Sequence, residues 1–506
     1  MSRRIRLAVA AVAALAVVGP LGWAWQDSLL PSTYSVMDLG RPDLGGGPDA
    51  HVHHGVSVAD LTGPAGEPDV AVTLTARRES FVLGGGERMT GYTVNHLSPG
   101  PPIRATEGQL VAVTLVNESV ADGVTLHWHG VDVPNAEDGV AGVTQDAVPQ
   151  GGSHVYRFRA GRPGSYWYHS HQVSHEQVRQ GLFGALVIEP AGSGPAPGSG
   201  SEPGPGQGPG PAGLGPGAVV AGPAGLDVLA PVHTYANLRT VGGRTGTPRV
   251  DAAGPVRLRV VNTDNDTVRV TVAGAPYRLL ALDARDLHEP GELTGEAVLV
   301  PAGGRADLGL VVPSTGPAVR VDLGGVALVL GRPGAAPAPA LSPAGTVDPL
   351  RYGTPAPLGL DPGRADRRFT LRIGRFPGFV DGRPGVWWTV NGHLFPDVPM
   401  FVVREGDTVV MTIVNGSGKA HPMHLHGHHA VILSRDGTPA TGSPEWRDSL
   451  DVPAGSTYVL AFRADNPGIW MDHCHNLDHA AQGLVAHVAY EGVSEPYRVG
   501  RGNAPE

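Results

Sequence analysis

Two segments of this chain, far apart in the sequence, have nearly the same pattern of residues. They are EGQLVAVTLVN at 107–117 and EGDTVVMTIVN at 405–415, and a shorter related segment, PVRLRVVN, lies at 255–262. In each segment apolar side chains recur at alternate positions, as they do in a β-strand that buries one face. A strand that recurs in three places predicts an all-β chain built from three similar sandwiches.

Changes in composition along the chain separate these strand-rich blocks. Two segments rich in proline, glycine and alanine cannot bury a core, so we expect linkers there. We also expect the N-terminal part to hold an export segment and then a polar, glycine-rich segment that contains His51, His53 and His54. The expected divisions are 1–25 (export segment), 26–68 (polar segment), 69–190 (first domain), 191–230 (linker), 231–331 (second domain), 332–367 (linker) and 368–492 (third domain).

The first 25 residues have the pattern of a segment that directs export. Three arginines lie within the first six residues, and an apolar run from Leu7 to about Trp25 follows them. A basic start followed by an apolar run is typical of a signal peptide, and about 19 apolar residues can also just span a bilayer. We therefore expect a secreted, cell-envelope or membrane-anchored protein whose other residues lie outside the cytoplasm.

The overall charge and the cysteine content exclude several classes of protein. The net charge of −10 gives no basic face for nucleic acid, and 41% hydrophobic with 17% charged residues indicates a globular chain. A single cysteine, Cys474, excludes an intramolecular disulfide. A core of this size does not need one, so Cys474 is either a small core residue or a residue with a chemical role.

Histidines occur in four pairs that each have one residue between them. In a strand, side chains two positions apart point to the same face, about 7 Å from each other. Each pair thus offers two imidazoles on one side, and imidazole suits copper, zinc or iron. One pair could be a solvated surface feature, but four pairs in one chain indicate bound metal. The pairs are His127/His129, His169/His171, His424/His426 and His473/His475.

The last of these pairs encloses Cys474, in the sequence WMDHCHNLDHAAQGL at 470–484. In a strand the cysteine must point away from the face that His473 and His475 share. A thiolate with two imidazoles forms a blue-copper site, and those imidazoles would be His421 and His479. The short backbone between the thiol and the flanking imidazoles would then join two metal centres, on the order of 10 Å apart.

Four motifs carry a family resemblance. HWHG (127–130), HSH (169–171), HPMHLHGH (421–428) and HCHNLDHAAQGL (473–484) resemble, in order and spacing, the copper signatures of the multicopper oxidases. The resemblance covers roughly 70–190 and 368–490, is weaker in the middle block, and looks like the three-domain, laccase-like bacterial branch. It implies three cupredoxin-like Greek-key β-sandwich domains in tandem, one type 1 copper, and a three-copper cluster between the first and third domains.

The resemblance also implies a role for each histidine of these motifs and for the cysteine. By motif position, the type 1 copper takes His421, Cys474 and His479; the type 2 copper takes His127 and His424; one type 3 copper takes His129, His169 and His475; and the other takes His171, His426 and His473. Leu484 holds the axial position where some relatives have methionine. Since leucine cannot bind copper, we expect a raised type 1 potential.

Reduction of dioxygen to water needs protons as well as electrons. Asp138 matches a carboxylate that relatives place beside the cluster, although an ordinary Asp-Gly turn would explain it equally well. Some bacterial relatives have an acid directly after the histidine equivalent to His479, where this chain has Ala480. We further expect Asp448 to support a type 1 imidazole or to lie in a surface turn, and His428 or His429 to line the approach to type 1 copper.

The sequence thus predicts an exported laccase-like oxidase with four copper ions. It would couple one-electron oxidation of small phenolic donors, through Cys474, His473 and His475, to the reduction of O2 to water. A metallo-oxidase of Cu(I) or Fe(II) is the alternative within this chemistry, but the seven methionines do not cluster as a Cu(I) site would require. A copper-binding protein without turnover is the alternative from another class. Neither the physiological donor nor the oligomeric state follows from the sequence.

Overall fold

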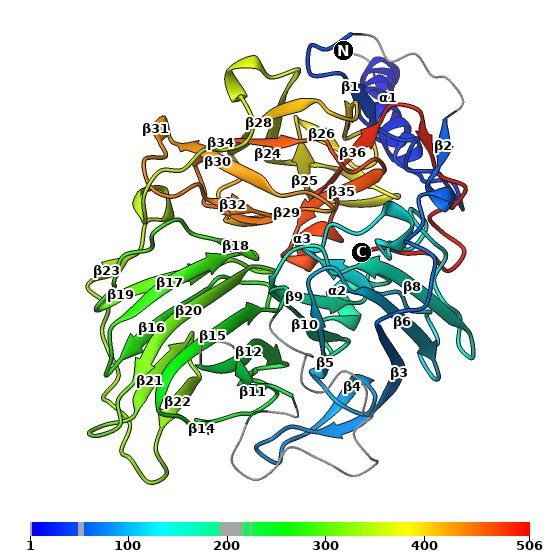
Figure 1. Cartoon of the computed structure of the whole chain (residues 1–506). Helices are drawn as coiled ribbons and strands as arrows, with labels where there is room; N and C mark the ends of the chain where they lie inside the picture. The colour runs from blue at the N-terminus through cyan, green and yellow to red at the C-terminus, as the bar shows by residue number, and fades with distance from the viewer. Residues whose placement is uncertain (1–2, 49–54, 193–213, 215–216, 223–224) are drawn as a thin grey trace.

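The computed structural model describes residues 3–48, 55–192, 214, 217–222 and 225–506, so His51, His53 and His54 lie outside the described residues. Within these ranges three blocks of β-strands follow one another along the chain. Figure 1 shows them as a triangle, with the first block at lower right, the middle block at lower left and the third block at the top. The helices are α1 (Arg3–Asp27), α2 (Ser174–Gln177) and α3 (Leu477–Ala480), and the single 3-10 turns are η1 (Val58–Asp60), η2 (Asn135–Glu137), η3 (Pro349–Arg351) and η4 (Pro362–Arg364).

The first block consists of two four-stranded sheets. Large apolar side chains such as Trp128, Tyr156 and Phe158 lie in the core between them, fully buried. One sheet has the order β4 (Arg88–Val94), β3 (Val70–Val82), β6 (Leu110–Asn117), β8 (Ser153–Arg159), and the other has the order β5 (Gly100–Thr106), β10 (Phe183–Glu189), β9 (Gly164–His169), β7 (His127–His129).

The middle block also consists of two sheets. Its strands begin at Val219, earlier than the start near Pro231 that the proline-rich composition suggested. The first sheet has the order β11 (Val219–Gly222), β12 (Gly225–Tyr235), β15 (Gly254–Asn262), β20 (Arg305–Val312), β17 (Tyr277–Leu282), β18 (Arg285–Asp286), with β13 (Leu238–Val241) beside β12. The second has the order β14 (Arg249–Asp251), β22 (Ala327–Gly331), β21 (Val319–Leu323), β16 (Val268–Ala273), β19 (Glu296–Val300), β23 (Gly345–Thr346).

The third block incorporates part of the N-terminal segment. Strand β1 (Arg41–Asp43) pairs with β27 (Pro399–Val403), and β2 (Val56–Ser57) pairs with β37 (Val493–Ser494). The sheet that contains β1 continues through β36 (Val485–Tyr490), β35 (Ile469–Cys474), β29 (His421–Leu425) and β33 (Ser449–Val452). The other sheet has the order β26 (His393–Leu394), β25 (Arg383–Val390), β24 (Arg367–Val380), β28 (Thr408–Asn415), β34 (Thr457–Arg463), β30 (Ala430–Arg435), β31 (Thr438–Pro439), with β32 (Trp446–Arg447) beside β30.

The three segments that resemble one another in sequence occupy equivalent places. Strands β6, β15 and β28 each pair in parallel with an earlier strand and antiparallel with a later one. The same neighbours in the same order in all three blocks mean that the repeated sequence pattern corresponds to a repeated fold. The prediction of three similar β-sandwiches is therefore confirmed.

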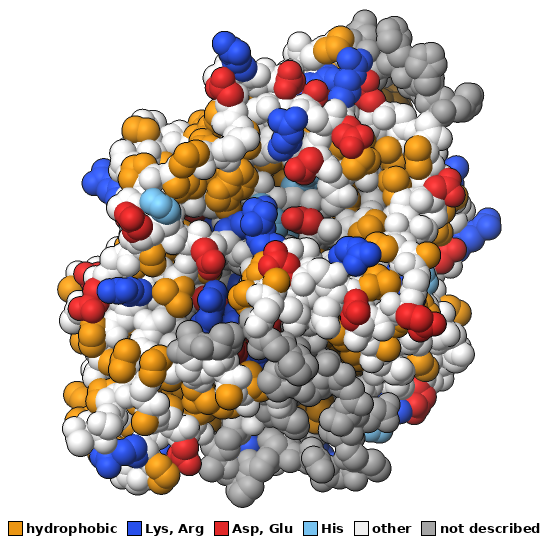
Figure 2. Space-filling view, viewed as in Figure 1, with side chains coloured by type: hydrophobic (Ala, Val, Ile, Leu, Met, Phe, Trp, Pro, Cys, Tyr) orange, Lys and Arg blue, Asp and Glu red, His pale blue; other side chains and the backbone are white. Residues whose placement is uncertain are grey.

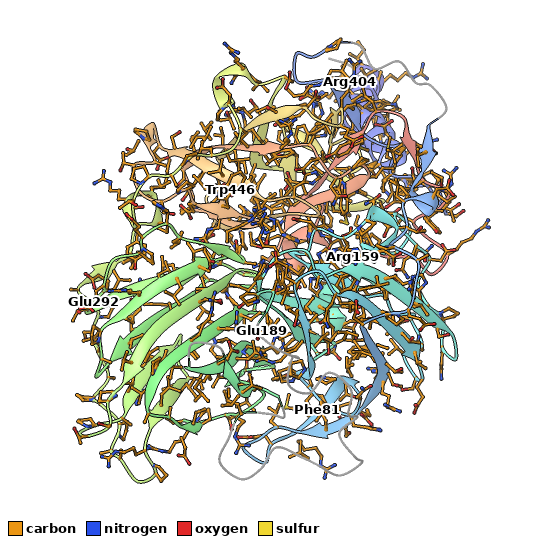
Figure 3. The ribbon with its side chains drawn as sticks, viewed as in Figure 1. Phe81, Arg159, Glu189, Glu292, Arg404 and Trp446 are labelled. Atoms are coloured by element: carbon orange, nitrogen blue, oxygen red, sulfur yellow. The ribbon has the colours of Figure 1, made fainter. Side chains whose placement is uncertain are left out.

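Buried ion pairs join the first block to the middle block. Arg104 of β5 contacts Glu189 of β10 at 2.7 Å and Asp227 of β12 at 3.0 Å, and Arg259 of β15 contacts Asp227 at 2.6 Å. Glu189 is labelled in Figure 3, where the two blocks meet. On the face of the molecule shown in Figure 2, by contrast, acidic and basic side chains are scattered among neutral and hydrophobic ones.

Candidate metal centre

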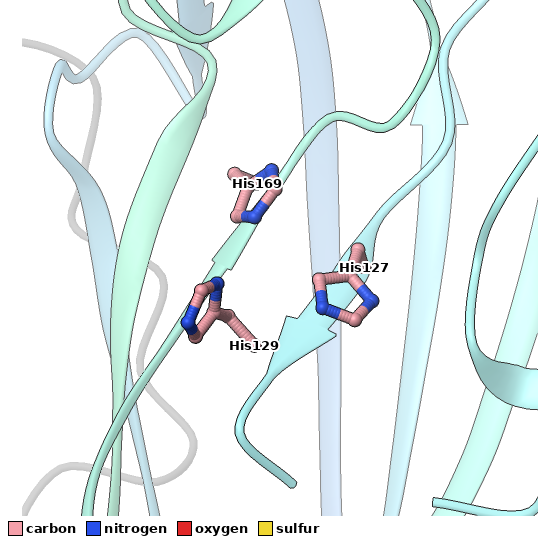
Figure 4. Close-up of side chains that lie close together, drawn as sticks. All are labelled: His127, His129 and His169. Atoms are coloured by element: carbon pink, nitrogen blue, oxygen red, sulfur yellow. The ribbon is translucent and has the colours of Figure 1, made fainter. Parts of the chain in front are cut away.

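Eight histidines from the first and third blocks converge where these blocks meet. Their rings lie at the ends of β7, β9, β29 and β35 or directly after these strands, and each residue is at most 2% exposed. Figure 4 shows three of the rings, from β7 and β9, facing a common space. The eight are His127, His129, His169, His171, His424, His426, His473 and His475.

The distances between the ring nitrogens suit shared metal ions. Nε2 of His127 lies 3.4 Å from Nε2 of His424, and Nε2 of His426 lies 3.1 Å from Nε2 of His473. Together with His171, the latter two form a group whose possible ligand atoms lie within 4.8 Å of one another. The histidine pairs therefore meet across the two blocks, as the family resemblance implied.

Several of the buried ring nitrogens have no hydrogen-bond partner in the described part of the chain. They include Nδ1 of His129 and Nε2 of His169, His171 and His475. Burial lowers the pKa of all four imidazoles, to about 3 for His475, so the rings are neutral and able to bind a metal. An unpaired nitrogen inside a protein is costly, and one or more bound copper ions would satisfy these four. The donor set thus fits copper.

On three rings of the cluster, the outer nitrogen Nδ1 is held by a backbone carbonyl group. Nδ1 of His127 donates to the carbonyl of Asp138 at 3.0 Å, and Nδ1 of His424 donates to that of Asp448 at 2.9 Å. Nδ1 of His171 donates to the carbonyl of Pro505 at 3.0 Å. Such outer contacts fix the tautomer and the orientation of a metal-binding imidazole, so Nε2 of these three rings is directed inward.

Asp138 lies among the histidines rather than in an exposed turn. Its carboxylate is 3.0 Å from Nδ1 of His426 and 3.1 Å from Nδ1 of His127, and the residue is 1% exposed. It therefore links an imidazole of the first block to an imidazole of the third. The structure also brings Glu506 within 3.1 Å of Nδ1 of His473, which the sequence did not suggest, and burial raises the pKa of Glu506 to about 8.

A second, smaller group surrounds the single thiol. Sγ of Cys474 is 3.6 Å from Nδ1 of His421 and 3.7 Å from Nδ1 of His479. Burial lowers the pKa of these imidazoles to about 3 and about 4, and raises the pKa of the thiol. Leu484 is fully buried in the apolar cluster that also contains Cys474. Two neutral nitrogens and a sulfur at these separations form the donor set of a blue-copper site.

Strand β35 connects the two groups. Its pairing with β29 sets Cys474 opposite Met423 and His473 opposite His424, so neighbouring side chains of β35 point to opposite faces. The thiol therefore faces His421 and His479, whereas His473 faces the eight-histidine cluster. The sequence predicted this two-sided arrangement.

Asp448 does not support a type 1 imidazole, contrary to our expectation. In the β29–β33 pair His421 is opposite Val452 and His424 is opposite Ser449, which sets Asp448 at the far end of β29 from His421. There its carboxylate contacts Nε2 of His129 at 3.2 Å. The error arose because the register of β33 decides which histidine the carboxylate meets, and sequence spacing does not give that register.

Neither His428 nor His429 lines the approach to the thiol group. His428 is buried, and its Nε2 lies 2.7 Å from the hydroxyl of Tyr490. His429 lies between two carboxylates, 3.3 Å from Asp132 and 3.2 Å from Asp448. Both rings are therefore buried against other partners, and the expectation for them was wrong.

The middle block reaches the cluster through residues that sequence reasoning missed. Arg305 of β20 holds both carboxylate oxygens of Asp448, at 2.6 and 2.5 Å. Burial by itself would raise the pKa of Asp448, but the Arg305 guanidinium holds it well below its usual range. The backbone of Gly303 lies against the rings of His129 and His475. No motif in the sequence distinguishes these residues, because their role depends on contacts between blocks.

Comparison with known proteins extends the likeness beyond the motifs. Family models described as multicopper oxidase match residues 75–193 and residues 373–492. These two ranges contain all four histidine pairs and the cysteine.

Individual relatives resemble the chain over most of its length. Multicopper oxidase MmcO of Mycobacterium tuberculosis is 28% identical over 86% of this chain and 90% of its own length. Laccase-1 of Botryotinia fuckeliana is 28% identical over 83% of this chain and 81% of its own. The crystal structure of a multicopper oxidase from Pseudomonas thermotolerans is 25% identical, with a TM-score of 0.63, over 83% of this chain and 98% of that one. The fold is that of tandem cupredoxin-like domains, as the sequence predicted.

Proposed function

Because this chain belongs to the multicopper oxidase family, and is thus a copper-dependent oxidoreductase with dioxygen as acceptor, we propose that it is an exported, laccase-like member. It would oxidise small phenolic or similar donors one electron at a time and reduce O2 to water. The observation that carries this proposal is the two-sided strand β35, with the Cys474 thiol on one face and His473 on the other.

We assign the copper ligands as the motifs imply. His421, Cys474 and His479 would hold the type 1 ion, and the eight histidines of the cluster would hold the type 2 ion and the type 3 pair. When bound, these ions accept electrons singly and supply the four electrons that dioxygen needs. The backbone of β35 keeps the thiol and the cluster histidines at a fixed separation, and burial keeps water from the cluster, whereas His479 of the type 1 group is partly exposed.

Asp138 is our candidate for the residue that holds a proton beside the cluster. It is buried, and its carboxylate lies about 3 Å from Nδ1 of both His127 and His426. A carboxyl group in this place can pass a proton to a reacting oxygen without exposing the cluster to solvent. We assign this role here, rather than to a residue after His479, because Ala480 follows that histidine.

The surroundings of the type 1 group favour aromatic donors over metal cations. The ring of Trp388 lies 4.6 Å from that of His421 and 4.5 Å from that of His479. The guanidinium of Arg375 lies 4.6 Å above Trp388, and the exposed Lys419, the only lysine of the chain, is two residues from His421. These positive charges repel Cu(I) and Fe(II), whereas they do not repel a neutral phenol.

Substituting the thiol tests the electron route directly. Cys474→Ser should abolish the intense absorption at about 600 nm of the copper-loaded protein together with its turnover, because the thiolate is the donor that defines the blue site. Circular dichroism should show the fold unchanged. If Cys474→Ser oxidised a methoxyphenol at the original rate, the assigned route would be wrong.

Two further measurements separate the alternatives. Turnover of a methoxyphenol compared with turnover of Cu(I) distinguishes the laccase-like function from that of a metallo-oxidase. Oxygen uptake with either donor excludes a copper-binding protein without turnover, and its absence with every donor would contradict the proposed function.

A further inference from the structure

The C-terminal end of helix α1 is attached to one particular turn of the third block. The indole Nε1 of Trp25 donates to the carbonyl of Gly382 at 3.1 Å, and the backbone N–H of Gly382 donates to Oγ of Ser28 at 3.1 Å. The N–H of Asp381 donates to the carbonyl of Ser28 at 3.0 Å. This turn joins β24 to β25, so the tip of that hairpin (residues 376–387) lies where the helix ends.

Helix α1 has the length and composition of a membrane span. It has 25 residues and an 18-residue window of mean hydropathy 2.1, and it is the one such helix in the described part of the chain. At about 1.5 Å per residue it exceeds the roughly 30 Å thickness of a hydrocarbon core. None of its residues is buried against the protein, and Leu15 is 70% exposed. The protein itself therefore leaves these apolar side chains uncovered.

The hairpin tip also exposes large apolar side chains. Phe376 is 60% exposed and Val386 is 53% exposed, although both belong to paired strands. Phe376 is opposite the half-buried Trp387, and Pro377 is opposite Val386. Apolar residues therefore occur on both faces of the tip, so packing against a single protein surface would cover only half of them.

Exposed arginines accompany these apolar residues, in a chain whose net charge is −10. Arg372, Arg375 and Arg383 are all exposed along β24 and β25. The carboxylate of Asp381, at the turn, accepts a hydrogen bond from the N–H of Leu30 at 3.3 Å. Basic and apolar side chains side by side are the combination that binds the headgroup layer of an anionic bilayer.

We propose that α1 stays on the protein as a membrane anchor and that the β24–β25 hairpin rests in the headgroup layer of an anionic phospholipid membrane. A turn hydrogen-bonded to the end of a spanning helix must lie at the membrane surface. Phe376 and Val386 would insert below the phosphates, and Arg372, Arg375 and Arg383 would contact them. Helix and hairpin then form one continuous membrane-binding surface.

This placement also sets the position of the type 1 group relative to the membrane, a step that rests on the proposed function. Trp388 directly follows Trp387 of the hairpin and packs on both type 1 histidines. The type 1 group would therefore lie close to the membrane surface, within reach of donors that partition into the bilayer interface.

A single-site fluorescent probe can test the placement in the full chain. The one native thiol, Cys474, is fully buried, so a cysteine introduced at an exposed position can be labelled selectively. We would label Phe376→Cys with an environment-sensitive fluorophore, in nanodiscs of phosphatidylcholine and phosphatidylglycerol. The matched control is Val311→Cys on β20 of the middle block, because Val311 is 61% exposed and lies in another block.

We expect the Phe376→Cys probe to emit at shorter wavelength and to be quenched severalfold more by nitroxide-labelled lipid than the control probe. Iodide in the water should quench the control more strongly. Equal quenching of both probes by iodide would overturn the proposal. It would also be overturned if the mass of the membrane-purified protein showed that residues 1–27 had been removed. The probe signal does not depend on copper, so its failure leaves the proposed oxidase function untouched.

Discussion

Gly303 has no room for a side chain on the face that it turns to the cluster. A Cβ atom there would lie 2.7 Å from Cε1 of His129 and 2.9 Å from Cδ2 of His475. Its φ of +77° is also a conformation that glycine adopts without strain. This one residue of the middle block therefore limits where two of the proposed type 3 ligands can lie.

We expect Gly303→Ala to lower the copper content of the cluster, because the added methyl group displaces His129 and His475. Gly316→Ala is the matched control, since Gly316 has a φ of +82° and open space around it. The backbone strain is then similar in both variants, and only the contact with the histidines differs. Copper per chain and the type 3 absorption measure the effect, while the band at about 600 nm reports the type 1 site separately. Equal copper content in both variants would contradict this role.

His487 gives a pH dependence that can be tested apart from the copper ligands. Burial lowers its pKa to about 4, from about 6.5 in an unfolded chain. Between these values the unfolded state binds more protons than the folded state, so stability rises with pH from about 4 to about 6.5 and is level above. We expect His487→Leu to lose less stability than the parent when the pH falls from 7 to 5. Thermal unfolding of the copper-free proteins measures this, and an equal loss in both would show that His487 does not contribute.

At the scale of elements, the contact between β20 and the residue before β33 joins the middle block to the cluster. Arg305 and Asp448 are each about 1% exposed in their side chains, and the pair is bidentate. Asp448 in turn contacts His129. The middle block supplies none of the proposed copper ligands but holds the carboxylate that orients one of them.

Removing one partner of such a pair leaves a buried charge without compensation. We expect Arg305→Met to lower the free energy of unfolding of the copper-free protein by about 3–5 kcal/mol. Arg320→Met is the control from the same block, because its ion pair with Asp322 is about one-quarter exposed. Loss of a partly exposed pair should cost about 1 kcal/mol or less. Urea unfolding of both variants measures the difference. Similar losses of unfolding free energy would show that the Arg305–Asp448 pair stabilises the protein no more than the partly exposed pair does.

The sequence predicted the structural features that follow from local alternation of residues. It predicted few of the contacts between strands that are distant in the sequence. Period-two patterning gave the strands, and alternation in β35 gave the opposite orientations of Cys474 and His473. The contacts of Asp448, His428 and His429 depend on strand register and on residues from another block, so their predicted positions were wrong. Arg305 was not predicted at all, because a single arginine in a strand of the middle block has no local signature.

At the scale of the whole molecule, the first and third blocks each supply four histidines to one cluster. Six nitrogens on these rings have no hydrogen-bond partner among the residues that the structure describes. The contact between the first and third blocks therefore contains unsatisfied polar groups beside the contacts of Asp138 and Asp448. The first and middle blocks, by comparison, meet through buried ion pairs of Arg104 and Arg259. We infer that copper at the cluster holds the first and third blocks together.

Removing copper should therefore lower the unfolding temperature of the whole chain. A ligand that binds only the folded state at 100 times its dissociation constant stabilises by about 2.7 kcal/mol, and several ions add to this. Cys474→Ser separates the two sites, since it should empty the type 1 site and leave the histidines of the cluster in place. We expect calorimetry to place copper-loaded Cys474→Ser close to the loaded parent and well above the copper-free parent. If Cys474→Ser unfolded at the temperature of the copper-free parent, the type 1 ion rather than the cluster would be the stabilising one. If chelation did not change the unfolding temperature, copper would not hold the blocks together.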